Sequence, residues 1–360
     1  MKLKDFSKVL QSSTVLRSRN RLQPAGGNGD VVYPPTYSEG STRHFRRIDG
    51  ESRTCVLLDA VTSQANRMEQ ALRDSSITTP HLSVNVGNYH LTSYDVPHRI
   101  CDAILRGCTL DGVPYLNSSV GKAILNHDVR EIFGYSPSSL LFGFWHSNRT
   151  GGVGIKVPRS IASEIVAVDV ENAPHTASRI DQLPISKASK VESIKKPDVV
   201  AKEGWDWRLN AKGKKPSEAL LGNIPPSITD DRGITMDYAL QCVSISLSSL
   251  RSLSLGNDSE VGVNFLAALG VAGFAEAFSK GCRLRSRCDL LPESQYVWEA
   301  LSGPESVSLG EISSEVALGL LEESISDVKK AGLPWHETTM LEPSDDLLKL
   351  VEEGVQSIGV

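Results

Sequence analysis

The chain has 360 residues, of which 40% are hydrophobic and 22% charged, as expected for a soluble globular protein of one large or two ordinary domains. We expect no membrane span, because no apolar run approaches the roughly 20 residues that one needs, and the charged first residues lack the apolar segment of a secretory signal. We therefore expect a cytoplasmic protein without membrane contact. The six cysteines form no CxxC pair and lie in apolar runs, which favours reduced core thiols.

The net charge of −5 conceals an uneven distribution. Residues 1–48 hold nine Lys or Arg against three acids, residues 183–217 hold nine against four, and residues 292–360 hold three against fourteen. A charged run is most often a solvated face. Two basic segments on an otherwise acidic chain also favour a surface that binds a polyanion.

In chain order, residues 1–30 read as a basic lead-in, and the apolar, partly β-branched residues 55–61 predict a buried strand. A helix follows directly, because Ala65, Met68 and Leu72 recur at helical spacing behind potential caps. We expect a strand or hairpin at 81–92, helices from 95 and from 119, strands at 140–145 and 161–170, a strand from 238, a helix at 261–280 and a last strand at 282–291. The acidic end predicts one good helix at 313–330 and a weaker one from 345. This order predicts an α+β sheet domain with large insertions.

No catalytic or metal-binding motif stands out. The sequence lacks a G-x-S-x-G elbow, an H-E-x-x-H motif and a phosphate-binding loop of the required spacing. The Cys and His spacings match no zinc pattern. We therefore predict a non-enzymatic protein without a metal or other cofactor.

The signal for nucleic-acid binding is distributed along the chain. Arg and Lys attract phosphates through counterion release, and aromatic side chains stack on bases of a single strand. Each basic residue taken alone is more often an ordinary surface charge. The candidates lie at expected turns and strand ends: Arg43, His44, Arg46, Arg47, Arg67, His146, Arg149, Lys156, Arg159 and the Lys-rich segment 187–215, which includes Lys214 and Lys215 and lies around Trp205 and Trp207.

Several blocks of the sequence resemble the RAMP-superfamily backbone subunit of the type I-G (formerly I-U) CRISPR–Cas surveillance complex, a family of Cascade backbones. The most telling blocks are SQANRME at 63–69 and LLFGFWHS at 140–147. The others span most of residues 31–290, at 33–37, 58–62, 98–106, 136–139, 159–166, 222–227, 247–253 and 284–288.

The resemblance implies an RRM-like (ferredoxin-like) palm with finger and thumb insertions. On this basis residues 1–291 form the RRM-like domain, with a finger or helical region at about 75–135 and a thumb at about 172–232, and residues 292–360 form an acidic helical C-terminal region. It also implies that Ser63, Gln64 and Asn66 join Arg67 as RNA contacts at the helix start. A purely structural helix start is the alternative. Arg67→Ala is expected to weaken RNA binding more than folding.

The implied function is a CRISPR RNA-binding backbone that polymerises along the guide in a type I interference complex and presents it for pairing with target DNA. The implied partners are the CRISPR RNA, target DNA through the guide, other copies of the chain in a helical filament, the other subunits, and a separate helicase–nuclease. One alternative is a RAMP-type endoribonuclease that uses an Asp, or a His such as His44 or His146. Another is an α+β scaffold that binds a small molecule or a protein.

Overall fold

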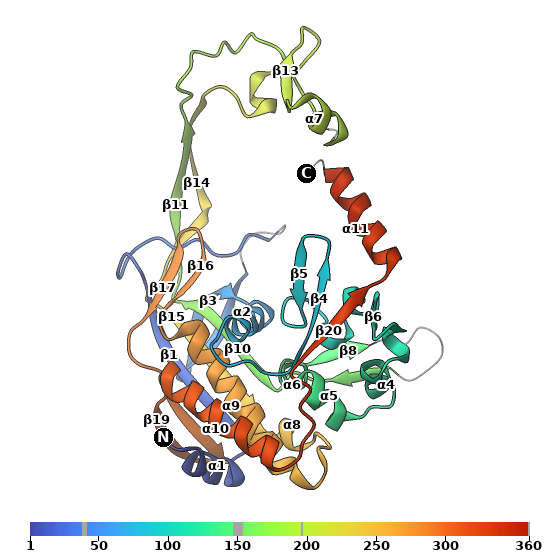
Figure 1. Ribbon diagram of the computed structural model, residues 1–360. Coiled ribbons are helices and arrows are strands. Elements are labelled where there is room, and N and C mark those ends of the chain that lie inside the picture. Colours follow the sequence, from blue (N-terminus) through green and yellow to red (C-terminus); the bar gives the residue numbers. More distant parts are fainter. Residues whose placement is uncertain (38–41, 147–153, 196, 359–360) are drawn as a thin grey trace. The chain divides into compact units, whose positions relative to one another are not determined.

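The computed structural model describes residues 1–37, 42–146, 154–195 and 197–358. The chain forms two compact units (Figure 1). The first unit comprises residues 1–171 and 234–344, and the second comprises residues 172–233 and 345–360. Most of the predicted candidates lie in the first unit.

A nine-stranded sheet is the centre of the first unit. Its order is β16-β17-β1-β15-β10-β3-β2, and β18 pairs with both β1 and β19. Neighbouring strands are antiparallel wherever their register is described. The strands are β1 (Val15–Pro24), β2 (Arg43–Ile48), β3 (Glu51–Asp59), β10 (Ile161–Val168), β15 (Tyr238–Ser246), β16 (Cys282–Arg285), β17 (Cys288–Pro292), β18 (Val297–Ser302) and β19 (Glu305–Glu311).

Helices α2 (Val61–Arg73), α9 (Ser259–Phe278) and α10 (Ser314–Lys330) lie together on one side of this sheet (Figure 1). Close packing there depends on small residues of α9. A Cβ at Gly270 would lie 2.8 Å from Ile245 of β15, and one at Gly273 would lie 3.0 Å from Leu72 of α2. The shorter helices of this part are α1 (Leu3–Ser12), α8 (Leu247–Arg251) and the 3₁₀ turn η4 (Gly256–Asp258).

In contrast to the expectation from the sequence, one described helical stretch, Gly256–Phe278, has the length and apolar composition to cross a membrane. Of its apolar stretch, 78% is buried inside the protein. A core helix has this same character, because a helix that packs on several sides is apolar all round.

A smaller five-stranded sheet belongs to the same unit, in the order β5-β4-β20-β6-β7. Residues 338–341 of β20 run parallel to β4. The strands are β4 (His81–Val86), β5 (Tyr89–Thr92), β6 (Cys108–Leu110), β7 (Val113–Pro114) and β20 (Thr338–Pro343). Beside them are the turns η1 (Arg99–Cys101) and η2 (Tyr115–Asn117), the helices α3 (Ala103–Arg106), α4 (Ser119–Leu125), α5 (Val129–Tyr135) and α6 (Pro137–Phe142), and the hairpin β8 (Phe144–His146) and β9 (Ile155–Val157).

The second unit has little regular structure. It contains two small two-stranded sheets, β11–β14 and β12–β13, and α11 packs against α7. Its elements are β11 (Glu171–Arg179), β12 (Val191–Ser193), α7 (Pro197–Glu203), β13 (Trp207–Leu209), η3 (Pro216–Ala219), β14 (Ile224–Thr235) and α11 (Asp345–Ile358).

The mixed α+β class predicted from the sequence is confirmed, as are α2, α9, α10 and the weaker helix α11. The strand predicted at 140–145 is wrong, because residues up to 142 form α6 and only 144–146 form a strand. The basic lead-in contains β1, and the acidic end contributes three strands, β18, β19 and β20. These strands were not predicted.

Candidate nucleic-acid interface

Strand β1 carries a row of arginines that was not predicted from the sequence. Its burial alternates, so that Arg17, Arg19 and Arg21 are exposed on the face opposite the buried residues. Each arginine has a partner: Arg17 bonds Glu299 at 2.7 Å, Arg19 bonds Asp49 at 3.2 Å, and Arg21 lies 4.1 Å from the ring centre of Tyr238. The signal was present as the alternation L-R-S-R-N-R-L. Because carboxylates offset much of its charge, this row is a weak candidate for phosphate binding.

Strand β2 separates two groups of predicted candidates. His44 and Arg46 lie on the same side as the buried Ile48, whereas Arg43 and Arg47 are exposed on the other side with Phe45. Both Nη groups of Arg46 donate to the carboxylate of Glu164, and its Nε donates to the His44 ring. The bonds to Glu164 raise the pKa of Arg46. The structure therefore leaves the Arg43 and Arg47 side of β2 as the more accessible basic face.

The start of α2 is built on a buried carboxylate. Asp59, the last residue of β3, is 2% exposed. Its Oδ2 accepts hydrogen bonds from Nε of Arg67 at 3.0 Å and from Nε2 of Gln64 at 2.5 Å, and Nη2 of Arg285 lies 3.8 Å from Oδ1. Two arginines thus balance one buried charge. Ser63 is half-buried and Asn66 is exposed on the same helix.

Gln64 is fully buried, so the structure does not bring this predicted contact to the surface. Its Oε1 accepts hydrogen bonds from Ser163 Oγ at 2.9 Å and from Gln241 Nε2 at 2.8 Å. Gln241 Oε1 in turn accepts from the Tyr296 hydroxyl at 2.6 Å. A buried chain of polar groups therefore connects Asp59 to Tyr296 next to β18, and Gln64 is a member of that chain.

Arg67 is partly exposed and links α2 to β16. Its Nη1 and Nη2 donate to the carbonyl oxygens of Arg283 at 3.3 Å and Leu284 at 3.0 Å. With the bond to Asp59, three of its five N–H groups are used by described residues, and the other two can serve a ligand.

The hairpin β16–β17 adds three arginines beside Arg67. Arg283 is exposed, and Arg285 donates to the carbonyl oxygen of Leu58 at 2.6 Å. Arg287 lies 5.5 Å from the ring centre of Tyr33 and forms an ion pair with Asp30 at 3.3 Å. We refer to Arg67, Arg283, Arg285 and Arg287 as the α2–β16 cluster. The basic alternation of this segment is visible in the sequence, but none of these three was predicted as a contact. Only the fold shows that the hairpin packs against the start of α2.

The hairpin β8–β9 carries a second group of candidates. His146 is buried, and its pKa is lowered by burial and by the nearby Arg106. Arg159 donates to the carbonyl oxygen of Phe142 at 3.1 Å, and burial lowers its pKa. Lys156 is exposed and pairs across the strands with Trp145, whose exposure is 58%. Arg149 lies outside the described residues.

Lys214 and Lys215 belong to the second unit. The Lys214 side chain is 78% exposed, with Glu218 at 3.9 Å. Lys215 precedes η3 and is exposed. Trp205 in the same unit is also exposed, at 68%. This unit therefore combines accessible lysines with an accessible aromatic ring.

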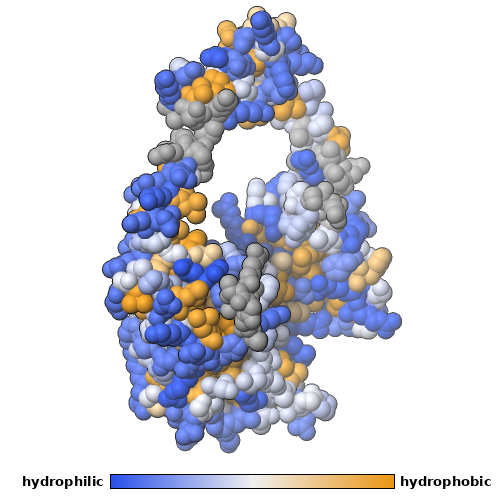
Figure 2. Space-filling view, turned by 90° about the vertical axis from the view of Figure 1, so that its right-hand side faces the viewer, coloured by the Kyte–Doolittle hydropathy of each residue, from blue (hydrophilic) through white to orange (hydrophobic). Residues whose placement is uncertain are grey.

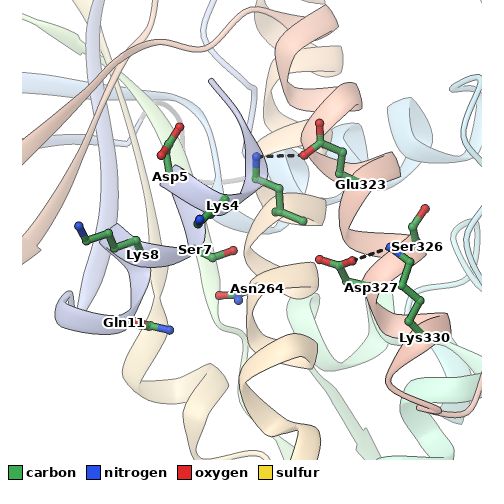
Figure 3. Close-up of a pocket in the computed structure, with 11 residues that line it drawn as sticks. Lys4, Asp5, Ser7, Lys8, Gln11, Asn264, Glu323, Ser326, Asp327 and Lys330 are labelled. Atoms are coloured by element: carbon green, nitrogen blue, oxygen red, sulfur yellow. Dashed lines mark hydrogen bonds and ion pairs between the residues drawn. The ribbon is translucent and has the colours of Figure 1, made fainter.

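A hollow of about 830 Å³ lies between α1, α9 and α10 (Figure 3). Its walls mix Lys4 and Lys8 with Asp5, Glu323 and Asp327. Such mixed charge does not favour a polyanion. Across the described ranges, no group of three or more His, Cys, Asp or Glu residues could hold a metal ion.

The structure is therefore that of a mixed α+β protein. Its basic surface clusters lie at the edge of the large sheet and at the start of α2. Residues 16–172, somewhat under half of the chain, match the family model described as CRISPR-associated protein GSU0053. This part of the chain is therefore similar to a family of CRISPR-associated proteins, in agreement with the resemblance found in the sequence. None of the curated proteins is significantly similar to the chain.

The chain also has distant likenesses to solved structures. A chain titled "CRISPR RNA-guided surveillance complex, pre-nicking" is 10% identical at a TM-score of 0.37, with 95% of this chain and 100% of that chain covered. "Crystal structure of Thermofilum pendens Csc2" is 8% identical at 0.31, covering 98% and 80%. "CRISPR RNA-guided surveillance complex" is 10% identical at 0.31, covering 90% and 86%.

Proposed function

We propose that this protein is a CRISPR RNA-binding backbone subunit of a type I surveillance complex. The observation that carries the proposal is the family match over residues 16–172, which includes β2, α2 and the β8–β9 hairpin. The basic residues of these elements give the surface its attraction for phosphates. The subunit binds the guide and has no chemistry of its own.

In this proposal the sheet is an RRM-like palm. Strands β1, β10, β15 and β17 with helices α2 and α9 follow in the order strand–helix–strand–strand–helix–strand, and the four strands lie in the order β17-β1-β15-β10. This order, with β2 and β3 inserted between β1 and α2, supports the proposal of a ferredoxin-like unit. Residues 75–135 serve as the finger region, residues 172–232 as the thumb, and the acidic residues 292–360 as the C-terminal region.

The α2–β16 cluster, the exposed face of β2 and the β8–β9 hairpin are the proposed phosphate contacts on the first unit. Ser63, Asn66, Arg67, Lys156 and Arg159 keep the roles expected from the sequence. Lys214 and Lys215 serve the thumb. Several copies bind head to tail along one RNA, which is the heterologous contact that forms filaments. The guide then pairs with target DNA. A separate helicase–nuclease in the cytoplasm degrades the target DNA.

A binding titration tests this function. The full chain is mixed with labelled single-stranded RNA over a series of salt concentrations, and the logarithm of affinity should fall linearly with the logarithm of salt. Arg283→Gln should weaken binding and reduce the slope by about 0.7, whereas the control Lys330→Gln on α10 should change neither. Lack of RNA binding at low salt refutes the proposal. Cleavage of the RNA that His146→Ala abolishes would favour the endoribonuclease instead.

A further inference from the structure

Phe45 is a large apolar side chain that the fold leaves in water. It lies in the middle of β2, at the end of the strand order, and its exposure is 75%. Phe has no polar group that would favour such a position, and a buried Phe is worth about 1.5–3 kcal/mol relative to an exposed one. An edge strand with an exposed aromatic ring also risks pairing with other chains. A ligand that covers the ring would explain its position.

The two neighbours of Phe45 on the same face are Arg43 and Arg47. Side chains two apart on a strand point the same way and are separated by about 7 Å, so Phe45 lies between two arginine side chains on this face. Arg43 also donates to the carbonyl oxygen of Val170 at 3.3 Å. His44 and Arg46 point to the other face, where Glu164 binds Arg46. The face with Phe45 therefore carries two arginine side chains beside the ring.

An aromatic ring between two cations fits one class of ligand. In single-stranded nucleic acid, flat bases alternate with anionic phosphates along the backbone, and proteins bind it through aromatic stacking combined with positive charge. A lipid surface or an acidic peptide would use the arginines but offers no flat group for the ring. Apolar residues are scattered over the mostly hydrophilic face drawn in Figure 2, so exposure alone would not single out Phe45. Its place between two arginines does.

We infer that Phe45 is a stacking platform for a base of a single-stranded nucleic acid, with Arg43 and Arg47 holding the adjoining phosphates. This inference rests on the proposed function. It adds a contact between the protein and a base of the nucleic acid to the contacts with phosphates. The same pairing of an exposed ring with a cation occurs at Trp145 and Lys156 of the β8–β9 hairpin.

The test separates stacking from charge. The unmodified chain and the full chain carrying Phe45→Leu, Phe45→Trp or Arg47→Gln are titrated with labelled oligoadenylate over a range of salt concentrations. The affinity of each for inorganic polyphosphate is measured by competition with the labelled RNA. Phe45→Leu should weaken RNA binding at least about fivefold without changing the salt slope, because stacking involves no counterions. Phe45→Trp should keep the RNA affinity of the unmodified chain, because the indole ring also stacks on bases. Arg47→Gln should instead lower the slope by about 0.7.

The control is Val307→Ala, which removes exposed apolar surface from β19, the outermost strand on another side of the same sheet. It should leave RNA affinity unchanged. If the unmodified chain binds RNA and Phe45→Leu binds it equally well, the inference is refuted and the proposed function stands. If Phe45→Leu weakens binding to polyphosphate as much as to RNA, the ring does not stack on bases and the inference is also refuted. If the unmodified chain does not bind RNA, the proposed function itself fails.

Discussion

Arg67→Ala tests both the fold and the interface, because Arg67 neutralises a buried charge. The substitution removes the 3.0 Å bond to Asp59, which is 2% exposed, and two bonds to backbone carbonyls of β16. Asp59 keeps Gln64 and the more distant Arg285. A hydrogen bond to a charged group contributes about 1.5–3 kcal/mol, so we expect a loss of about 2–3 kcal/mol in the free energy of unfolding. The structure thus adds a folding cost that the sequence did not predict.

Urea unfolding measures that loss, and RNA titration measures the effect on binding. We expect RNA affinity to fall about tenfold and the salt slope to fall by about 0.7, because the variant neutralises one phosphate fewer. The double variant Asp59→Asn with Arg67→Gln separates the effects, since it removes the buried carboxylate together with its partner. Its stability should recover, but its RNA affinity should not.

Two results would refute this reasoning. One is that Arg67→Ala changes the free energy of unfolding by no more than about 0.5 kcal/mol, as an ordinary surface substitution does. The other is full recovery of RNA affinity in the double variant, which would mean that Arg67 acts only by supporting Asp59.

Three further predictions concern the stability of the first unit. Glu69→Ala should lower the free energy of unfolding, measured with urea, by about 3–5 kcal/mol. It leaves the buried Arg99 without the carboxylate that binds it at 2.6 and 2.7 Å. A loss as small as that of a surface substitution would contradict this prediction. Gly143→Ala should lower the melting temperature, since its φ is +80° and a Cβ would lie 2.7 Å from a backbone nitrogen; an unchanged melting temperature would show that the turn relaxes. Burial raises the pKa of Cys101 and Cys282 to about 12. The folded protein should therefore resist thiol reagents near neutral pH, and rapid labelling of the folded protein would contradict this. Its free energy of unfolding should also fall as pH rises from 9.0 towards 12, because the thiols of the unfolded chain ionise first.

Helices were predictable where one side is apolar. In α2, Ala65, Met68 and Leu72 are buried at helical spacing, as the sequence indicated. Strand β1 was missed because its buried face is partly polar. Ser18 Oγ donates to the carbonyl oxygen of Val297 at 2.8 Å, and Asn20 Nδ2 donates to that of Ser294 at 2.6 Å. Both partners lie more than 270 residues away, so the local sequence gives no sign that these groups are satisfied inside.

The candidate site was predictable in its parts but not in its combination. The basic segment at 43–47 and the start of α2 were found from the sequence. The division of β2 into two faces, with Glu164 on one of them, depends on a pairing over 118 residues. The contact of Arg67 with β16 spans more than 210 residues. Charge patterns show which residues are basic, but only the fold shows which of them a carboxylate offsets.

The position of β1 in the sheet also sets an order for folding during synthesis. This strand leaves the ribosome before its partners β15, β17 and β18, and Val15 pairs with Leu301. Contacts so far apart in sequence form late and slowly. Until then both edges of β1 have no strand beside them. Arg17, Arg19 and Arg21 then act as gatekeepers, because charges along an open strand discourage pairing with other nascent chains.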